Sequence, residues 1–254
     1  MTIPDGLTAF TLAQRPDLER EVRSMSAGLL PEFMHHDTGA NRFWGRLFTD
    51  FAGFQIALVD GADRVVAAGN CVPLFWDGRV EGLPGGVGET VERVIGDLEG
   101  GRAPNVASAL LALVSPGEQG RGLSGVVLRE MKRLAAGHGL TALIAPVRPT
   151  LKHRYPLTPM DRYTRWTRPD NRPFDPWLRV HGRMGAEFLR VAPKSMTVTG
   201  TISKWEEWTG MSFPESGPYV VPGALQPVEM DLEEDLGTYE EPNVWMRHPI
   251  EGGG

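Results

Sequence analysis

The chain has 254 residues, a formal net charge of −6 and 41% apolar residues, a composition typical of a folded globular protein. This length suits one large domain or two small ones, and such a domain buries enough surface to fold without disulfides or a structural metal. Cys71 is the only cysteine, which excludes an internal disulfide and a cysteine-based zinc site. The acidic balance argues against nucleic acid and against an anionic membrane as the main partner.

Two features predict a cytoplasmic protein. The opening MTIPDGLTAF contains no basic residue and no long apolar run, unlike a secretory signal. The longest strongly apolar stretch, residues 107–114, is too short to span a bilayer. We therefore expect a cytoplasmic location and no membrane partner.

The N-terminal part of the chain predicts a strand, two helices and a hairpin. Residues 7–12 are expected to form the strand, and Pro16-Asp17 begins a helix with apolar residues on one face. Aromatic and leucine residues between 43 and 51 indicate a second, short helix. Residues 54–60 and 64–76 flank Asp60-Gly61 and are rich in apolar and β-branched residues, which is typical of a hairpin. A further helix is expected within 77–105.

The C-terminal part predicts strands that alternate with helices. Residues 107–114 and 141–147 read as buried strands, and 122–136 between them as an amphipathic helix that ends at His138-Gly139. An irregular segment rich in tryptophan and proline follows over 149–176. A helix is then expected at 177–184 and two strands at 185–191 and 195–202. Beyond Trp208 the sequence predicts mostly turn and extended coil.

This order of elements predicts a mixed α/β fold around one central sheet flanked by helices. We expect residues 1–210 to form one domain with insertions at about 77–105 and 149–176. Residues 211–254 are expected to be an extended C-terminal segment that packs on this domain.

The most informative stretch is Val114-Ser-Pro-Gly-Glu-Gln-Gly-Arg-Gly-Leu-Ser124, between a predicted buried strand and the clearest helix. Unpaired N–H groups and the dipole at a helix N-terminus bind phosphate or pyrophosphate, and Arg121 adds a charge nearby. Three interpretations are open. A nucleotide-binding P-loop has this glycine spacing, but Leu123 replaces the required lysine. The other two are a connection without a ligand and a site for the pyrophosphate of coenzyme A.

The sequence here resembles the GNAT family of acyl-CoA-dependent N-acyltransferases, whose signature is Gln/Arg-x-x-Gly-x-Gly/Ala after the fourth strand. Gln119-Gly120-Arg121-Gly122-Leu123-Ser124 matches it, with serine at the last position. The resemblance implies that acetyl-CoA or another acyl-CoA is the co-substrate. It also implies that Val114, Gln119, Gly120, Arg121, Gly122, Leu123 and Ser124 bind it. Because the family's sheet splays between its fourth and fifth strands, backbone near Val114 and Ala145 would flank the pantetheine arm.

A second match lies at Val180-His181-Gly182-Arg183-Met184-Gly185-Ala186-Glu187, which resembles the family's Leu-Tyr-x-x-x-Gly-Phe-Glu. The family tyrosine, often the general acid toward the leaving thiolate, falls at His181. An unperturbed imidazole has a pKa near ~6.5 and can protonate a thiolate at neutral pH. Tyr155 is the rival acid, or an aromatic plug over the cleft. The resemblance covers residues 7–202, without the 149–176 insertion and the tail.

Other candidate residues are less specific. The strand 107–114 has no acid, which leaves His36, Glu89, Glu92 or a water chain to deprotonate the amine. Arg148 and Lys152 either hold a carboxylate or phosphate or lie on the solvated surface. His35-His36-Asp37 lacks a matching distant ligand pair, so no metal is expected. Cys71 lies in an apolar strand and is expected in the core.

We predict that the protein moves an acyl group from a pantetheine thioester to an amine of a small-molecule acceptor by direct attack. The long insertions favour a bulky acceptor, as in specialised metabolism. Two alternatives are an acyl carrier protein as the donor and a non-catalytic CoA-binding protein. A carrier protein would need a basic surface beside the loop, for which the candidates are Arg121, Arg129, Lys132 and Arg133.

Overall fold

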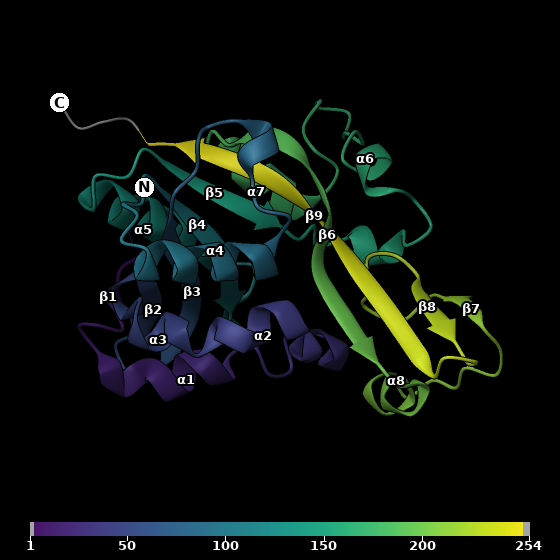
Figure 1. Ribbon diagram of the computed structural model, residues 1–254. Helices are drawn as coiled ribbons and strands as arrows, with labels where there is room; N and C mark the ends of the chain where they lie inside the picture. The colour runs from purple at the N-terminus through teal and green to yellow at the C-terminus, as the bar shows by residue number, and fades with distance from the viewer. Residues whose placement is uncertain (1–2, 251–254) are drawn as a thin grey trace.

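The computed structural model describes residues 3–250, apart from the side chains of Thr38 and Ala40, and is built around one sheet (Figure 1). Its strands follow the order β1-β2-β3-β4-β5-β9-β8-β7, and β6 pairs with β9 outside this path. The predicted mixed α/β fold with one central sheet is confirmed. The strands in chain order are β1 Leu7–Thr11, β2 Gln55–Asp60, β3 Val65–Leu74, β4 Val106–Val114, β5 Ala142–Val147, β6 Glu187–Gly200, β7 Gly217–Tyr219, β8 Val228–Asp231 and β9 Leu236–Pro249.

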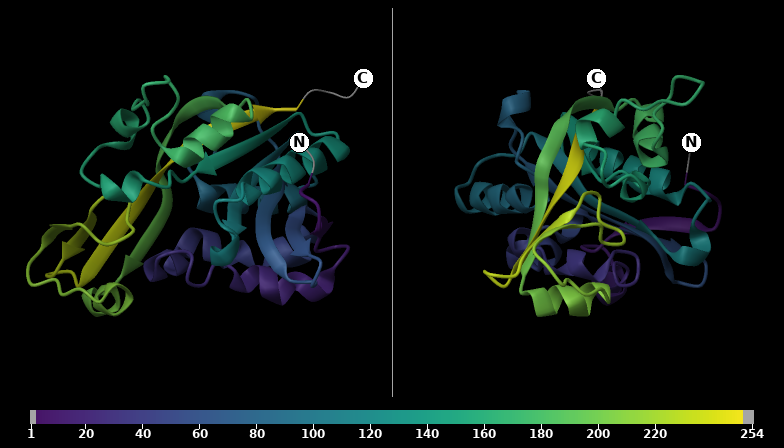
Figure 2. Two further views of the ribbon diagram at one scale, coloured as in Figure 1. Left: turned by 180° about the vertical axis from the view of Figure 1, so that it is seen from behind. Right: turned by 90° about the vertical axis from the view of Figure 1, so that its right-hand side faces the viewer.

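Helices cover both faces of the sheet (Figure 2). They are α1 Glu19–Ser24, α2 Thr38–Trp44, α3 Arg46–Thr49, α4 Val87–Glu99, α5 Leu123–Gly137, α6 Met160–Tyr163, α7 Pro176–Arg183 and α8 Ile202–Thr209. One core lies between the sheet and α1, α3 and α4, and it contains Ala68, Leu110 and Trp245. The second lies between the sheet and α5 and α7, and it contains Ala109, Ala145 and Val244. We call the face of the sheet that packs against α4 the α4 face, and the face that packs against α5 the α5 face.

Most predicted elements of the first 184 residues are present. The hairpin of β2 and β3, the buried strands β4 and β5, and the helices α4, α5 and α7 are confirmed. Helix α5 begins after Gly122, as the glycine-rich loop predicts. Within α5, the acidic residue Glu130 lies against the core and is only 8% exposed. Its carboxylate pairs with Arg133 Nε at 2.7 Å, which satisfies the charge near the core.

The prediction of turn and coil beyond Trp208 is wrong. Strand β9 has 14 residues and pairs antiparallel with β5 on one side and with β6 on the other. Its sequence contains Gly237 and Pro242 and its residues alternate irregularly between apolar and polar, so it lacks the period of a half-buried strand. A strand that is buried on both faces is stabilised by its two neighbours, and a local pattern does not report them.

The two strands expected at 185–191 and 195–202 form one strand, β6. Its register against β9 shifts between Phe188 and Arg190 and again between Ala192 and Met196. Pro193 lies at the second irregularity, where a residue without an N–H group is tolerated. The far halves of β6 and β9 extend away from the rest of the sheet, with α8, β7 and β8 beside them (Figure 1). This lobe has its own core of Phe33, Trp205, Tyr239 and seven other buried residues.

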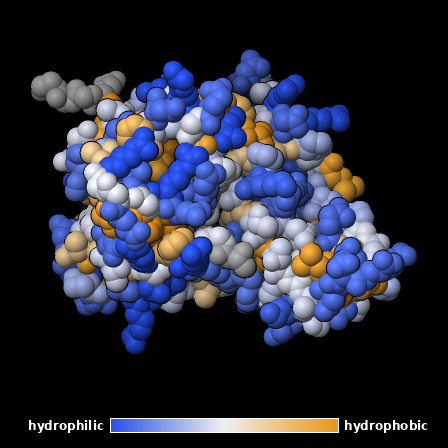
Figure 3. Space-filling view, viewed as in Figure 1, coloured by the Kyte–Doolittle hydropathy of each residue, from blue (hydrophilic) through white to orange (hydrophobic). Residues whose placement is uncertain are grey.

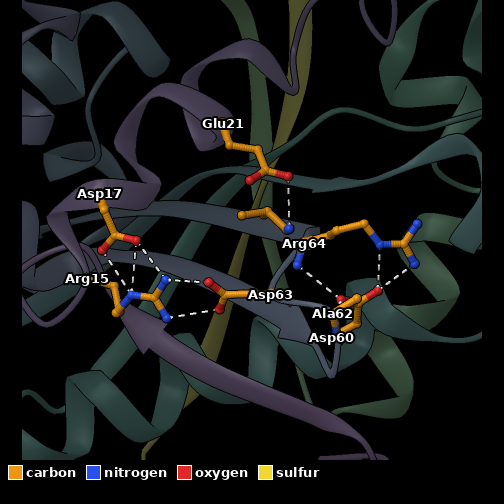
Figure 4. A network of polar contacts seen from close by, with 8 residues as sticks. Arg15, Asp17, Glu21, Asp60, Ala62, Asp63 and Arg64 are labelled. Carbon is orange, nitrogen blue, oxygen red and sulfur yellow. Dashed lines mark hydrogen bonds and ion pairs between the residues drawn. The ribbon is translucent and has the colours of Figure 1, made fainter.

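The segment after β1 is tied to the β2–β3 turn by polar contacts (Figure 4). The Arg15 guanidinium bonds to Asp17 and to Asp63, with Nη2 2.7 and 2.9 Å from their carboxylates. The Glu21 carboxylate accepts a hydrogen bond from the Val65 N–H at 3.0 Å. These ion pairs are exposed, so their contribution to stability is small. The surface seen in Figure 3 is mixed, with hydrophobic residues scattered among hydrophilic ones.

The sheet opens between β4 and β5, and this opening positions the site. Only Ala107–Leu143 and Ser108–Ile144 are paired between these parallel strands, so the strands separate beyond Ser108. Strand β4 also contains one extra residue opposite β3, because Asn70 pairs with Leu111 and Cys71 with Ala109. Beyond Ser108, the edge of β4 toward β5 has no strand partner among the described residues.

Candidate active site

The loop that precedes α5 presents free backbone donors. Gly120 and Gly122 have φ angles of +79° and +75°, a left-handed conformation that favours glycine. Gly122 is the N-cap of α5. In the part of the chain that the structure describes, the N–H groups of residues 120–124 have no hydrogen-bond partner. Unpaired N–H groups at the N-terminus of a 15-residue helix are suited to bind an anion such as a phosphate.

The side chains of this loop divide into three groups. Val114, Gln119 and Ser124 line a cavity below the loop. Arg121 is exposed and forms an ion pair with Glu118, which partly neutralises its charge. Leu123 is buried in the core on the α5 face, so only its N–H group is available to a ligand. All seven residues predicted to hold CoA therefore lie in or beside this one loop, with their side chains in different surroundings.

The cavity has a volume of about 620 Å³ and passes through the opening between β4 and β5. On the α5 face it is lined by Val114, Gln119, Ser124, Val147, Trp177 and His181. On the α4 face it reaches Leu29, Met34, His35, Asp37, Asn41, Asn70, Arg148, Glu241 and Asn243. This volume is typical of a small-molecule site. A ligand bound at the loop can therefore reach a second ligand through the sheet.

His181 lies in α7 and lines the cavity, 1% exposed. Its Nδ1 is 2.8 Å from Nε2 of His248 in β9. Its Nε2 is buried and has no hydrogen-bond partner among residues 3–250. Because one imidazole of the pair donates the proton of the shared bond, the pair fixes the ring of His181 and leaves Nε2 for a ligand.

Both imidazoles are neutral at physiological pH. Burial, and then the nearby His248, lower the pKa of His181 far below its ordinary value. Burial also lowers the pKa of His248, followed by the positive charge of Lys132. The expectation that His181 titrates near neutral pH is therefore wrong, because it ignores burial. A neutral imidazole can still donate one hydrogen bond from a ring N–H.

Tyr155 lies elsewhere, in an aromatic cluster of the 149–176 insertion. Its ring centroid is 4.9 Å from that of Trp166 and 5.8 Å from that of Phe174, both edge-on. Tyr155 is not among the described residues that line the cavity. The structure thus brings His181, but not Tyr155, to the opening of the sheet.

The three side chains proposed as bases do not line the cavity either. His36 stacks on Trp208 with 4.1 Å between ring centroids, and Glu89 pairs with Arg93. Glu92 is exposed on α4. The two residues that flank His36 in the sequence, His35 and Asp37, line the cavity instead. Residues 32–36 form a 3₁₀ helix, in which adjacent side chains point in different directions. A stretch of five residues is too short for its sequence to predict which of these side chains faces the cavity.

Three further cavity residues lie in strands on the α4 face and belong to no sequence motif: Asn70, Glu241 and Asn243. Asn70 is 4% exposed, next to the irregularity in β4, and its Nδ2 donates to Gln55 Oε1 at 2.9 Å. Glu241 and Asn243 lie in β9, which was expected to be coil. A polar residue inside an apolar strand was the only available signal for Asn70.

Arg148 and Lys152 are not on the solvated surface. Arg148 lines the cavity and pairs with Glu241. Lys152 is fully buried, and its Nζ donates to the carbonyl oxygens of Tyr155, at 2.9 Å, and of Leu225. Burial lowers the pKa of Lys152 to about 8. Lys152 therefore joins the insertion to the loop before β8.

Cys71 is a core residue, as predicted. It is fully buried, and burial raises the pKa of its thiol to about 12, so it is not a nucleophile. Among residues 3–250, no three His, Cys, Asp or Glu side chains gather as metal ligands do. Within the same residues, every helix is too short or too polar to cross a membrane.

The chain is similar to known proteins over nearly its whole length, although no family model matches it. It is 32% identical to the arginine N-acetyltransferase avaD of Aspergillus versicolor, over 98% of this chain and 96% of that protein. Two solved structures share the fold. The loading GNATL domain of CurA from Lyngbya majuscula has a TM-score of 0.55 at 14% identity, covering 96% of this chain and 98% of that one.

The second is the GphF GNAT-like decarboxylase in complex with isobutyryl-CoA, with a TM-score of 0.52 at 13% identity over 96% of this chain and 99% of that one. The full-length relative, the opened sheet and the anion site before α5 agree with the sequence signature. The chain therefore belongs to the GNAT family of N-acyltransferases, enzymes that transfer an acyl group from acyl-CoA to an amine.

Proposed function

We propose that this enzyme acylates a small-molecule amine held on the α4 face with an acyl group from free acyl-CoA bound on the α5 face. The observation that carries the proposal is one continuous cavity, lined by Gln119 and Ser124 beside the loop and by polar side chains on the α4 side. Next to this lining, the N–H groups of residues 120–124 have no partner among the described residues. The relative acts on arginine by its name, so arginine is the first acceptor to test, with acetyl-CoA as the donor.

The proposed reaction is direct attack in the opening between β4 and β5. The amine nitrogen forms a bond to the thioester carbonyl carbon, and the bond from that carbon to sulfur breaks. The proton that leaves the nitrogen passes to water and the thiolate takes one proton from water, so charge and protons balance. His181 donates a hydrogen bond from Nε2–H to the leaving sulfur, with His248 as the donor to its Nδ1. Holding both substrates in one cavity lowers the entropic cost of bringing the amine to the thioester.

Free CoA is a better match to this loop than a carrier protein. The carrier-protein alternative needs a basic surface, but Arg121 pairs with Glu118 and Arg133 with Glu130. The charges of two of the four candidate residues are thus already balanced. A cytoplasmic location stays a prediction.

Thermal unfolding with CoA and acetyl-CoA tests the donor site. Ligand at ~100 times its dissociation constant adds about 2.7 kcal/mol to the unfolding free energy. For a domain of this size we expect the midpoint to rise by roughly 5–10 °C. Gly122→Glu places a negative charge at the helix N-terminus and should abolish the rise.

The matched control is Gly139→Glu. Gly139 is also exposed, has a φ of +70° and follows the other end of α5, so it carries the same backbone strain and the same added charge. Its protein should keep the rise in midpoint. If millimolar CoA leaves the wild-type midpoint unchanged, the free-CoA proposal is wrong.

A further inference from the structure

The α4 side of the cavity contains a polar wall of Arg148, Glu241 and Asn243. Arg148 follows β5 directly, and the other two are inward-facing residues of β9. Glu241 is fully buried and Asn243 is 2% exposed. The pairing of Val147 with Val244 places the end of β5 beside this part of β9. Groups this polar are rarely placed in a core unless they bind each other or a ligand.

The Arg148–Glu241 ion pair is held in place, but both side chains can form further hydrogen bonds. Arg148 Nε is 3.0 Å from both carboxylate oxygens of Glu241, and Arg148 Nη2 donates to the Gly223 carbonyl at 2.7 Å. Tyr239 donates its hydroxyl to Glu241 Oε2 at 3.0 Å. Nη1 is the one guanidinium nitrogen of Arg148 without a bond to the described residues. A carboxylate accepts about four hydrogen bonds, so Oε1 also retains capacity.

Asn243 adds an unused acceptor. Its Nδ2 donates to Ser195 Oγ at 2.9 Å, and Ser195 Oγ also accepts from the Val87 N–H at 3.3 Å. Oδ1 of Asn243 is buried and has no partner within residues 3–250. An unpaired buried carbonyl oxygen costs free energy that a donor on a ligand would recover.

Within residues 3–250, the wall therefore offers one unpaired cationic donor, one unpaired acceptor and one carboxylate oxygen that can accept a further hydrogen bond, and its formal charge is balanced. Elsewhere on the α4 side, Arg23 pairs with Glu19 at 3.2 Å, and the Asp37 carboxylate accepts from the Thr197 N–H at 3.0 Å. A ligand of only one charge would leave either Arg148 Nη1 or the Glu241 and Asn243 oxygens unmatched, whereas a zwitterion matches both. Bound substrates with charged ends are commonly fixed by such complementary pairs.

We infer that this wall binds an amino-acid-type acceptor, with its carboxylate on Arg148 Nη1 and a cationic nitrogen on Glu241 and Asn243 Oδ1. This inference rests on the proposed function, because it identifies the acceptor class for the same cavity. Arg148, Glu241 and Asn243 are then specificity residues that act on binding of the acceptor and not on the acyl donor.

A panel of acceptors with the wild-type enzyme tests the inference without any variant. Release of the CoA thiol from acetyl-CoA is followed with L-arginine, L-lysine and agmatine, which is arginine without its carboxylate. We expect kcat/KM for arginine or lysine to exceed that for agmatine by at least 100-fold, mostly through KM. Equal use of agmatine would overturn the inference while leaving the proposed function intact.

Glu241→Gln is the sharpest variant, because glutamine preserves the shape of the side chain and removes its charge. KM for the amino acid should rise at least tenfold, with KM for acetyl-CoA unchanged. Asn243→Leu should act in the same direction. The matched control is Glu240→Gln, the next residue of β9, which is paired with Lys194 outside the cavity and should leave both KM values unchanged.

Binding without the donor separates the two proposals. Calorimetry of arginine, lysine and agmatine with the protein alone measures recognition even if no amine is acylated. If the amino acids bind, agmatine does not and Glu241→Gln abolishes binding, the inference is correct even where transfer fails. If neither amino acid binds or is acylated by the wild-type protein, the inference is wrong.

Discussion

At the scale of single residues, the position of His181 can be predicted from the sequence, but its protonation state cannot. The family resemblance aligns His181 with a general acid, and the structure places it at the cavity. Burial makes the imidazole neutral, so it does not hold a spare proton at pH 7. His181 can instead offer a ligand its Nε2, which has no hydrogen-bond partner within residues 3–250. The contact of Nδ1 with His248 fixes the ring and directs Nε2 to the ligand.

Replacing His181 should therefore slow the chemical step and leave binding intact. We expect His181→Asn to lower kcat by about 100-fold, the lower end of the range for proton-transfer and hydrogen-bonding groups. KM for acetyl-CoA should change less than about threefold, because His181 lies apart from the anion site.

His138→Asn is the control for this experiment, since His138 is exposed at the end of α5 and stacks on Phe54 outside the cavity. Steady-state kinetics with the best acceptor measures both variants. An unchanged kcat in His181→Asn would show that another group meets the leaving sulfur.

At the scale of elements, Asp175 positions the helix that carries His181. It is 1% exposed, and its Oδ1 caps α7 by accepting from the N–H groups of Trp177 and Leu178. Its Oδ2 accepts from the Leu151 N–H at 2.8 Å and from the Tyr163 hydroxyl at 2.9 Å. One carboxylate thus joins α7 to the start and to the middle of the irregular insertion.

Loss of this cap should destabilise the protein measurably. Asp175→Ala removes an N-cap and leaves buried donors unpaired, so we expect the unfolding free energy to fall by about 2–4 kcal/mol. Asp175→Asn keeps an oxygen acceptor and should lose less. Urea unfolding measures both, with Asp161→Ala in the exposed first turn of α6 as the control. A loss below about 0.5 kcal/mol for Asp175→Ala would contradict the capping role.

At the scale of the whole molecule, the two buried histidines couple stability to pH. Their folded-state pKa values lie below the unfolded value of about 6.5, so below that pH the unfolded chain binds protons that the folded chain does not. The unfolding free energy should fall as pH decreases from 6.5, by up to about 1.4 kcal/mol per pH unit for each histidine. This stability is fully present above about pH 7.

Chemical unfolding between pH 7.5 and about 5.5 measures this slope above the range in which carboxylates titrate. The double variant His181→Asn/His248→Asn should have a much flatter profile than the wild type. His138→Asn should keep the wild-type slope. Identical slopes in the wild type and the double variant would show that the pair does not control acid stability.

The amino-acid sequence by itself determined the local elements, among them the glycine-rich loop before α5. Helix α5, the hairpin of β2 and β3 and the glycine-rich turn at residues 119–124 follow from short-range patterns, because capping, periodicity and positive φ are properties of neighbouring residues. The family signature lies in the same short stretch. His181 was found for the same reason.

Only the tertiary structure decided the place of β9 and, with it, the α4 side of the cavity. Gly237 and Pro242 obscure the strand in the sequence, whereas pairing with β5 and β6 stabilises it in the fold. This pairing brings three residues of β9 to the site: Glu241, Asn243 and His248. His248 lies more than 60 residues after His181 in the chain, and the two rings are in contact. Burial and long-range partners set their charge and orientation, and neither is a property of a local sequence window.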